Sequence, residues 1–266
     1  MKITTNGIQT NYTVEGSGPW ITFSHSLACN LGSWDAQAAA LSKHYTVLRY
    51  DTRGHGQSDA PDGAYSLDML ADDLKALLDG LGVKQTHFVG LSMGGMIGQT
   101  FALKYPGVFK SIALCDTTSS YGENALATWM DRVRITAEKG MAAVVEGTLS
   151  RWFTDPFRAS HPDIMKLFGD MIRTTPVAGY GGCCQALPHI NSTARLAQIK
   201  CPTIVIVGAD DPGTPVAMAR IIHQAMPGSE LAIIPSAAHI SNIEQPAAFN
   251  AALTGFLNKI GQGSAD

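Results

Sequence analysis

The sequence predicts an α/β fold: a mostly parallel central sheet flanked by helices, with a helical lid inserted into it. Short apolar segments with strand character alternate with amphipathic helical segments over most of the 266 residues, which is typical of a parallel sheet covered on both faces. Between residues 119 and 194, helical patterns instead follow one another without a convincing buried strand. We therefore predict a core domain over residues 1–118 and 195–266 and a helical lid over residues 119–194.

The first elements follow from local patterns. Asn6-Gly7 separates two strand-like segments, 2–5 and 9–14, and predicts a hairpin because this dipeptide adopts the positive φ angles of a tight turn. Further strands are expected at residues 20–23, 45–50, 86–91 and 111–115, and helices at residues 31–41, 67–81 and 93–104. Leucines line one face of the helix over 67–81, which makes its amphipathic pattern the clearest of the three.

The later elements include the lid helices and the return of the strand–helix alternation. Helices are expected at residues 130–148 and 164–174 in the lid, then strands at 203–207 and 230–234 and helices at 215–226 and 247–260. Residues 261–266 are expected to form an irregular tail.

The composition indicates a globular protein and excludes several classes of function. Hydrophobic residues make up 45% and charged residues 15% of the chain, which suits a packed core. The net charge of −3 offers no basic surface to nucleic acid. No apolar run reaches the length of a membrane span, and the first seven residues lack the apolar part of a secretory signal. We expect a cytoplasmic protein without nucleic-acid or membrane partners.

The cysteines and glycines give no sign of a metal or cofactor. The five cysteines follow neither the spacing of a zinc site nor that of a disulfide framework, which favours reduced thiols. The glycine-rich segment at residues 90–95 lacks the G-x-G-x-x-G pattern of dinucleotide sites. We therefore expect no metal and no cofactor.

The strongest functional motif is Gly90-Leu91-Ser92-Met93-Gly94, which fits G-x-S-x-G between a predicted strand and a predicted helix. A serine on such a sharp turn has a strained backbone, and Gly90 and Gly94 remove the clashes that side chains would cause. The turn exposes the hydroxyl and directs the helix N-terminus at the site, which favours developing negative charge. Ser92 is therefore the predicted nucleophile.

A base and an orienting acid are expected on two later loops. His239 follows the strand at 230–234 and is better placed than the other seven histidines to take the proton of Ser92. Asp210 and Asp211 both follow the strand at 203–207. We choose Asp211, because related hydrolases commonly carry the acid three residues after the glycine and four before the proline of this loop. The chain order Ser92, Asp211, His239 resembles that of the α/β-hydrolase fold.

The loop after the third strand, Ser24-His25-Ser26-Leu27-Ala28, is expected to complete an oxyanion hole. Backbone N–H groups of Met93 and Leu27 are the predicted donors. His25 is expected to shape the loop without transferring a proton. The segment Asp51–Ser58 is interpreted as a structural turn in which Arg53 ties loops together. Trp129 and Trp152 are expected in the lid core and, where the lid covers the pocket, also in the substrate wall.

With these loops in place, the chain resembles the 3-oxoadipate enol-lactonases of the α/β-hydrolase superfamily over nearly its whole length. The segments that carry the resemblance are Ser26-Leu27, Leu48–Gly56, Gly90–Met96, Leu114-Cys115, Gly182–Leu187 and His239–Pro246. The Gly-Cys-Cys segment of the lid and the Ser-Asn-x-Glu-Gln-Pro continuation after His239 are the narrowest of these. One departure is the oxyanion loop, which reads His25-Ser26-Leu27-Ala28 where the family has Asn-Ser-Leu-Gly.

The resemblance implies hydrolysis of a small anionic lactone, 3-oxoadipate enol-lactone, through an acyl-enzyme, in the bacterial breakdown of aromatic compounds. The substrate carboxylate needs a partner, for which Arg132 and Arg134 in the lid are the candidates. Cys183 and Cys184 are interpreted as small apolar fillers near the lid hinge.

Two kinds of alternative stay open at this stage. One is another enzyme of the same fold, a general carboxylesterase or a hydrolase of carbon–carbon bonds. The other is a ligand-binding receptor on a hydrolase fold, which would bind a lactone without turning it over.

Overall fold

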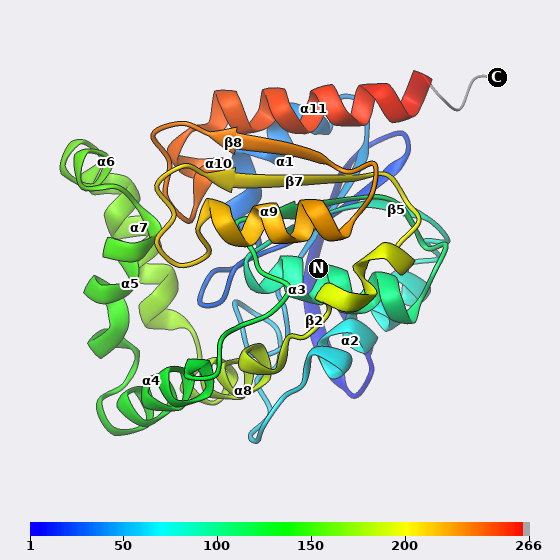
Figure 1. Ribbon diagram of the computed structural model, residues 1–266. Helices are drawn as coiled ribbons and strands as arrows, with labels where there is room; N and C mark the ends of the chain where they lie inside the picture. Colours follow the sequence, from blue (N-terminus) through cyan, green and yellow to red (C-terminus); the bar gives the residue numbers. More distant parts are fainter. Residues whose placement is uncertain (263–266) are drawn as a thin grey trace.

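A computed structural model describes residues 1–262 and places an eight-stranded sheet at the centre of the molecule (Figure 1). The strand order is β1-β2-β4-β3-β5-β6-β7-β8. The strands are β1 (Lys2–Thr5), β2 (Ile8–Gly16), β3 (Trp20–Ser24), β4 (Thr46–Tyr50), β5 (Thr86–Leu91), β6 (Phe109–Cys115), β7 (Thr203–Gly208) and β8 (Glu230–Ile234). In this sheet order, every pair of neighbours from β4 to β8 is parallel. The pairs β1–β2 and β2–β4 are antiparallel. The predicted fold class is confirmed.

The antiparallel edge begins with the predicted hairpin. Asn6 and Gly7 both have positive φ, at 49° and 76°, as a tight turn between β1 and β2 requires. β2 then pairs with β4 and brings the first segment of the chain into the sheet.

Helices cover both faces of the sheet, because each helix has one apolar side to bury (Figure 1). α1 and α11 lie on one face, and α2, α3 and α9 lie on the other. Their bounds are α1 (Asp35–Leu41), α2 (Leu67–Gly80), α3 (Met93–Lys104), α9 (Val216–Ala225) and α11 (Pro246–Gln262), with η1 (Leu31–Trp34) before α1, η4 (Thr193–Gln198) before β7 and α10 (Ser241–Glu244) before α11. The predicted tail thus begins inside α11, and residues 263–266 of that prediction lie outside the described residues.

Residues 119–194, here called the lid segment, run between β6 and β7 and are mainly helical (Figure 1). The helices are α4 (Ala125–Lys139), η2 (Met141–Val144), α5 (Val145–Trp152), α6 (Asp155–Ser160), α7 (Pro162–Thr174), α8 (Val177–Ala186) and η3 (Leu187–His189). The single helix expected over 130–148 is wrong, because Gly140 adopts a φ of 73° and ends α4 there.

α8 was not predicted, because its glycines lower intrinsic helix propensity. Close packing explains those glycines. Gly179 lies against Gly54, and a Cβ on Gly54 would stand 2.4 Å from the Gly179 Cα. Tertiary contact therefore stabilises a helix that local propensity disfavours.

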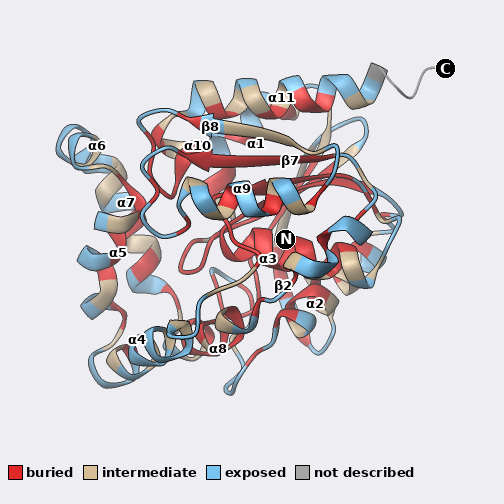
Figure 2. Cartoon of the chain, in the orientation of Figure 1, coloured by how far each residue is buried: buried red, intermediate tan, exposed pale blue. Residues whose placement is uncertain are grey.

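The buried residues are concentrated in the central sheet and on the inner sides of the helices that cover it (Figure 2). All six residues of β7 are buried, as are those of β5, because both strands have neighbours on each side and helices on both faces. The lid helices α4 and α6 carry many exposed residues on their outer sides (Figure 2). In the described part of the chain, no helix combines the length and apolarity needed to cross a membrane.

Candidate active site

Ser92 occupies a strained turn between β5 and α3. Its φ of 55° and ψ of −112° lie outside the regions that non-glycine residues favour. A Cβ on Gly90 would lie 2.4 Å from the Gly94 carbonyl oxygen, and one on Gly94 would lie 2.2 Å from the Ser24 carbonyl oxygen. Only glycine fits at these two positions, so the motif is required by the backbone as well as by the chemistry.

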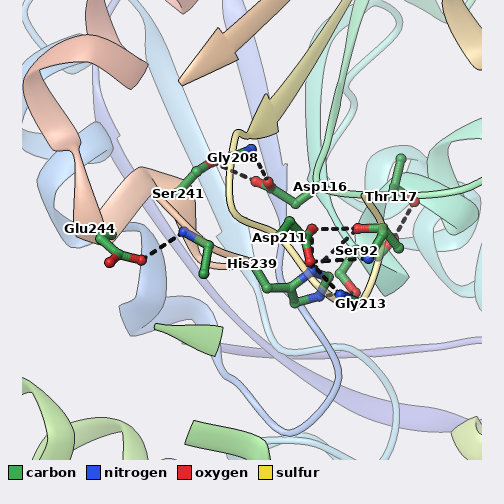
Figure 3. A network of polar contacts seen from close by, with 11 residues as sticks. Ser92, Asp116, Thr117, Gly208, Asp211, Gly213, His239, Ser241 and Glu244 are labelled. Atoms are coloured by element: carbon green, nitrogen blue, oxygen red, sulfur yellow. Dashed lines mark hydrogen bonds and ion pairs between the residues drawn. The ribbon is translucent and has the colours of Figure 1, made fainter. Parts of the chain in front are cut away.

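The side chains of Ser92, His239 and Asp211 form one hydrogen-bonded line (Figure 3). The Ser92 Oγ lies 2.9 Å from the His239 Nε2, and the His239 Nδ1 lies 2.8 Å from the Asp211 Oδ2. With Nδ1 protonated, Nε2 is free to accept the serine proton. Asp210 is exposed, and its backbone N–H donates to the Ala237 carbonyl. Of the two adjacent acids, Asp211 is the one that faces the imidazole.

Asp211 lies in a loop that favours its ionised form. Gly213 N–H, Thr214 N–H and Thr214 Oγ1 donate to this carboxylate at 2.7, 3.0 and 2.6 Å. Burial alone would raise the pKa of Asp211, but the charge and hydrogen bond of His239 and the bonds from Thr214 outweigh it and lower the pKa. Burial also opposes the charged form of His239, yet Asp211 prevails and raises the pKa of the imidazole. The pair therefore stabilises a positive charge on His239.

The predicted oxyanion loop is a tight turn beside the serine. Cys29 N–H donates to the Ser26 carbonyl at 3.1 Å, and Ala28 has a φ of 61°. Leu27 lines the same cavity as Ser92, and Met93 is the first residue of α3. A positive φ at a residue with a side chain costs about 1 kcal/mol, so the backbone of Ala28 is strained in this turn.

Two buried histidines hold this loop in place. His25 Nε2 accepts from Thr52 N–H at 3.0 Å, and His55 Nε2 accepts from Ala28 N–H at 3.0 Å. Burial lowers the pKa of His25 to about 4, and burial with the neighbouring His25 lowers that of His55 to about 3. Both rings are neutral acceptors, and their geometry supports the loop-shaping role predicted for His25.

These two histidines make the fold sensitive to acid. Below pH about 6.5 the unfolded chain protonates both imidazoles while the folded chain does not, so the free energy of unfolding falls as pH falls, by up to about 1.4 kcal/mol per pH unit for each. In a His55→Gln variant the Gln Oε1 takes over the contact with Ala28 N–H without titrating. Urea unfolding at pH 7 and pH 5 should show a smaller loss of stability in this variant than in the wild type. An equal loss in both proteins would contradict this origin of acid sensitivity.

The loop that carries His239 is anchored to the lid segment. Ala238 N–H donates to the Glu244 Oε2 at 2.8 Å (Figure 3). The other oxygen of Glu244 accepts from the backbone N–H of Thr154 at 3.0 Å and from its hydroxyl. Ile240 N–H donates to the Trp152 carbonyl at 3.1 Å. Residues 152–154 thus hold the backbone on both sides of His239. The contact is direct at Ile240 and passes through the Glu244 side chain at Ala238.

A cavity of about 330 Å³ opens beside Ser92 and His239. The lid segment supplies its outer wall, to which the predicted Trp129, Arg132 and Trp152 all contribute. Trp152 also packs edge-on against Phe168, with ring centroids 6.1 Å apart, and so belongs to the lid core as well. Sequence reasoning missed several other lining residues, among them Tyr121, Thr128, Thr148, Arg151, Tyr180 and Thr214.

Two guanidinium groups line this cavity. The Arg132 Cζ lies 4.4 Å above the centre of the Trp129 ring, and Arg151 donates to the Thr148 Oγ1 at 3.3 Å. Within residues 1–262 neither arginine forms an ion pair with a carboxylate. Burial and the charge of Arg132 lower the pKa of Arg151, which marks two like charges close together. Such a pair attracts an anion.

Arg134 does not share this position. It is exposed and forms ion pairs with Asp131 and Glu138 at 3.5 and 3.3 Å. Its candidacy as a carboxylate partner is therefore wrong, because residues two apart on a helix point to different sides.

Cys183 and Cys184 are both buried. Burial raises the pKa of Cys184 to about 12 and that of Cys183 well above its usual range. Because the thiolate is the reactive form, these values favour the interpretation as apolar fillers.

Comparison with known proteins places this geometry among hydrolases. Residues 19–246 match the family model described as alpha/beta hydrolase fold. The chain is 36% identical over 259 residues to 3-oxoadipate enol-lactonase 2 of Acinetobacter baylyi, covering 97% of this chain and 96% of that protein. Two solved structures are also similar. The enol-lactonase from Burkholderia xenovorans LB400 matches with a TM-score of 0.93 and 35% identity, over 97% of this chain and all of the other. A thermophilic esterase from Thermogutta terrifontis matches with a TM-score of 0.93 and 27% identity, over 98% of each chain.

Proposed function

The chain belongs to the α/β-hydrolase family, and from this premise we propose that it hydrolyses 3-oxoadipate enol-lactone to 3-oxoadipate through Ser92, His239 and Asp211. The observation that carries the proposal is the hydrogen-bonded line of these three side chains beside a cavity lined by Arg132 and Arg151. Neither arginine forms an ion pair with a carboxylate of the residues that the structure describes. The similarity to enol-lactonases over almost the whole chain supports this substrate.

In the first half of the reaction the lactone ring opens. The Ser92 Oγ attacks the lactone carbonyl while its proton passes to the His239 Nε2, and Asp211 stabilises the resulting imidazolium. Met93 and Leu27 N–H groups donate to the oxyanion, which the N-terminus of α3 also stabilises. The ring C–O bond then breaks. The departing oxygen takes the proton from His239 and leaves as an enol, a better leaving group than an alkoxide.

In the second half water releases the product. His239 takes a proton from water, whose oxygen attacks the acyl carbon, and the imidazolium then returns a proton to the Ser92 Oγ as the acyl–oxygen bond breaks. The product is a carboxylic acid, and its enol tautomerises to the ketone of 3-oxoadipate. The lid segment excludes bulk water from the acyl-enzyme.

The substrate carboxylate binds at Arg132 and Arg151. Both arginines line the cavity of Ser92, as do Tyr180 and Thr148, and Arg151 donates to the Thr148 hydroxyl. The net charge of −3 does not attract an anion to the molecule as a whole. Local cations therefore have to provide this affinity.

A substrate panel tests the proposed function. Values of kcat/KM for 3-oxoadipate enol-lactone, a neutral lactone of the same ring size and p-nitrophenyl acetate should decrease in that order. A neutral ester as the best substrate would reassign the protein as a carboxylesterase, which its likeness to the Thermogutta terrifontis esterase makes the second candidate. Binding without turnover of any member would indicate a receptor.

Arginine variants test the role of the two cations. Arg132→Gln and Arg151→Gln should each lower kcat/KM for the enol-lactone by about 10- to 100-fold, because a charge-assisted hydrogen bond to the substrate is lost. Activity on p-nitrophenyl acetate should change little. Arg134→Gln is the matched control, since it removes the same charge from the outer side of α4. Equal losses on the charged and neutral substrates would contradict the assignment.

A further inference from the structure

Asp116 is a buried acid that the mechanism above does not use. It follows β6 directly, adopts a φ of 44° and is fully buried, with 0% of its surface exposed. Its Oδ1 accepts from Gly208 N–H at 2.8 Å and its Oδ2 contacts the Ser241 Oγ at 2.5 Å (Figure 3). Within the described residues it has no cationic partner in an ion pair. A buried carboxyl group without such a partner is costly and needs a reason.

The two partners of Asp116 lie close in sequence to Asp211 and His239, in or next to the loops that carry these residues. Gly208 ends β7, three residues before Asp211, and Ser241 begins α10, two residues after His239. A single side chain therefore joins the loop of Asp211 to the loop of His239 (Figure 3), and neither Asp116 nor its two partners line the cavity.

The residues on either side of Asp116 hold the nucleophile. The Cys115 carbonyl accepts from Ser92 N–H at 2.8 Å, and the Thr117 Oγ1 donates to the Ser92 carbonyl at 2.8 Å. Residues 115–117 thus contact the turn of Ser92 and the loops that carry Asp211 and His239. Because Ser92 has a strained backbone, these two bonds also oppose its relaxation.

Charges surround Asp116 on several sides. Asp211 and His239 face it from their loops, and Arg132 acts on His239 from the lid segment. Burial and the negative charge of Asp211 raise the pKa of Asp116 to about 8. Below that pH Asp116 is protonated, so it acts on the loops of Asp211 and His239 through its hydrogen bonds and not through a charge. Cys115, the next titratable group on β6, is itself buried and neutral.

We propose that Asp116 is a positioning residue for the acyl-transfer reaction, holding the loops of Asp211 and His239 in register with Ser92. This inference rests on the proposed serine-hydrolase function. It predicts an effect on kcat and little effect on KM, because Asp116 is fully buried and does not line the cavity.

Two variants test the hydrogen bonds of Asp116. Asp116→Ala removes both contacts, and kcat per active site should fall by about 10- to 100-fold with little change in KM, as expected for a misaligned base. Asp116→Asn can still accept from Gly208 N–H and donate to the Ser241 Oγ, as the protonated acid does. It should keep most of the wild-type kcat and leave the acid limb of kcat/KM in place. Asp210→Asn, an exposed change in the same acid loop, is the matched control.

The assay uses p-nitrophenyl acetate, with active sites counted from the burst of p-nitrophenol, so that misfolded protein does not enter kcat. If the wild type gives no burst and no turnover on any ester or lactone, the serine-hydrolase function fails and this inference fails with it. If the wild type is active, wild-type kcat per active site in Asp116→Ala, or a loss of kcat in Asp116→Asn as large as that in Asp116→Ala, would overturn the inference alone. Both expected results together support it.

Discussion

Replacing Ser92 with alanine should lower kcat for the enol-lactone by about ten-thousandfold to a millionfold, because no other group in the site can form the acyl-enzyme. KM should change much less, since Arg132 and Arg151, the proposed partners of the substrate carboxylate, remain. The missing hydroxyl also removes the hydrogen bond to the His239 Nε2, which is 2.9 Å long in the wild type. Steady-state assays and a rapid-mixing test for an acylation burst would measure the effect.

The control for this change is Ser150→Ala, which removes an exposed hydroxyl from α5 in the lid segment. It should leave kcat and KM unchanged. Both variants should keep the circular dichroism spectrum and melting temperature of the wild type. A burst of normal size in Ser92→Ala would mean that another residue is acylated, and the proposed mechanism would fail.

Replacing Asp211 with asparagine should lower kcat by about ten-thousandfold, the effect that the same change has on the acid of a serine protease. An asparagine can present its amide N–H to the His239 Nδ1 and so stabilise the wrong tautomer, in which Nε2 is protonated and cannot accept from Ser92. It also removes the charge that stabilises the imidazolium.

Asp210→Asn is the natural comparison, because it changes the same residue type one position away. It should keep kcat within about twofold of the wild type, since its side chain is exposed and does not contact His239. Similar damage in both variants would show that the acid loop, and not the carboxylate of Asp211, carries the effect.

Local patterns predicted the strands and the flanking helices. They also predicted Ser92, Asp211 and His239, because each of these residues follows a predicted strand. The serine turn needs glycine at positions 90 and 94 whatever the rest of the chain does. Asp211 and His239 follow their strands at short distances, so the sheet itself brings them to one edge. The strain at Ala28 could not be predicted in this way, because its φ of 61° depends on the turn that the loop makes beside Ser92.

The lid segment and its cavity residues were harder to predict, because side-chain direction there depends on how short helices pack. Arg132 lines the cavity and Arg134 faces solvent, although both lie on α4. Arg151 is next to Trp152, yet no pattern identified it as a cavity residue. Asp116 gave no signal either, since its two partners lie 92 and 125 residues away in sequence.

The hydrogen bonds between residues 152–154 and the segment 238–244 have a consequence for how ligands reach Ser92. A movement that lifted the chain at Thr154 would break its bonds to Glu244 and the bond from Ile240 to the Trp152 carbonyl. Such a movement would free the backbone on both sides of His239 just as a ligand arrived. A ligand that enters without disturbing residues 152–154 therefore leaves the backbone on both sides of His239 held by these hydrogen bonds.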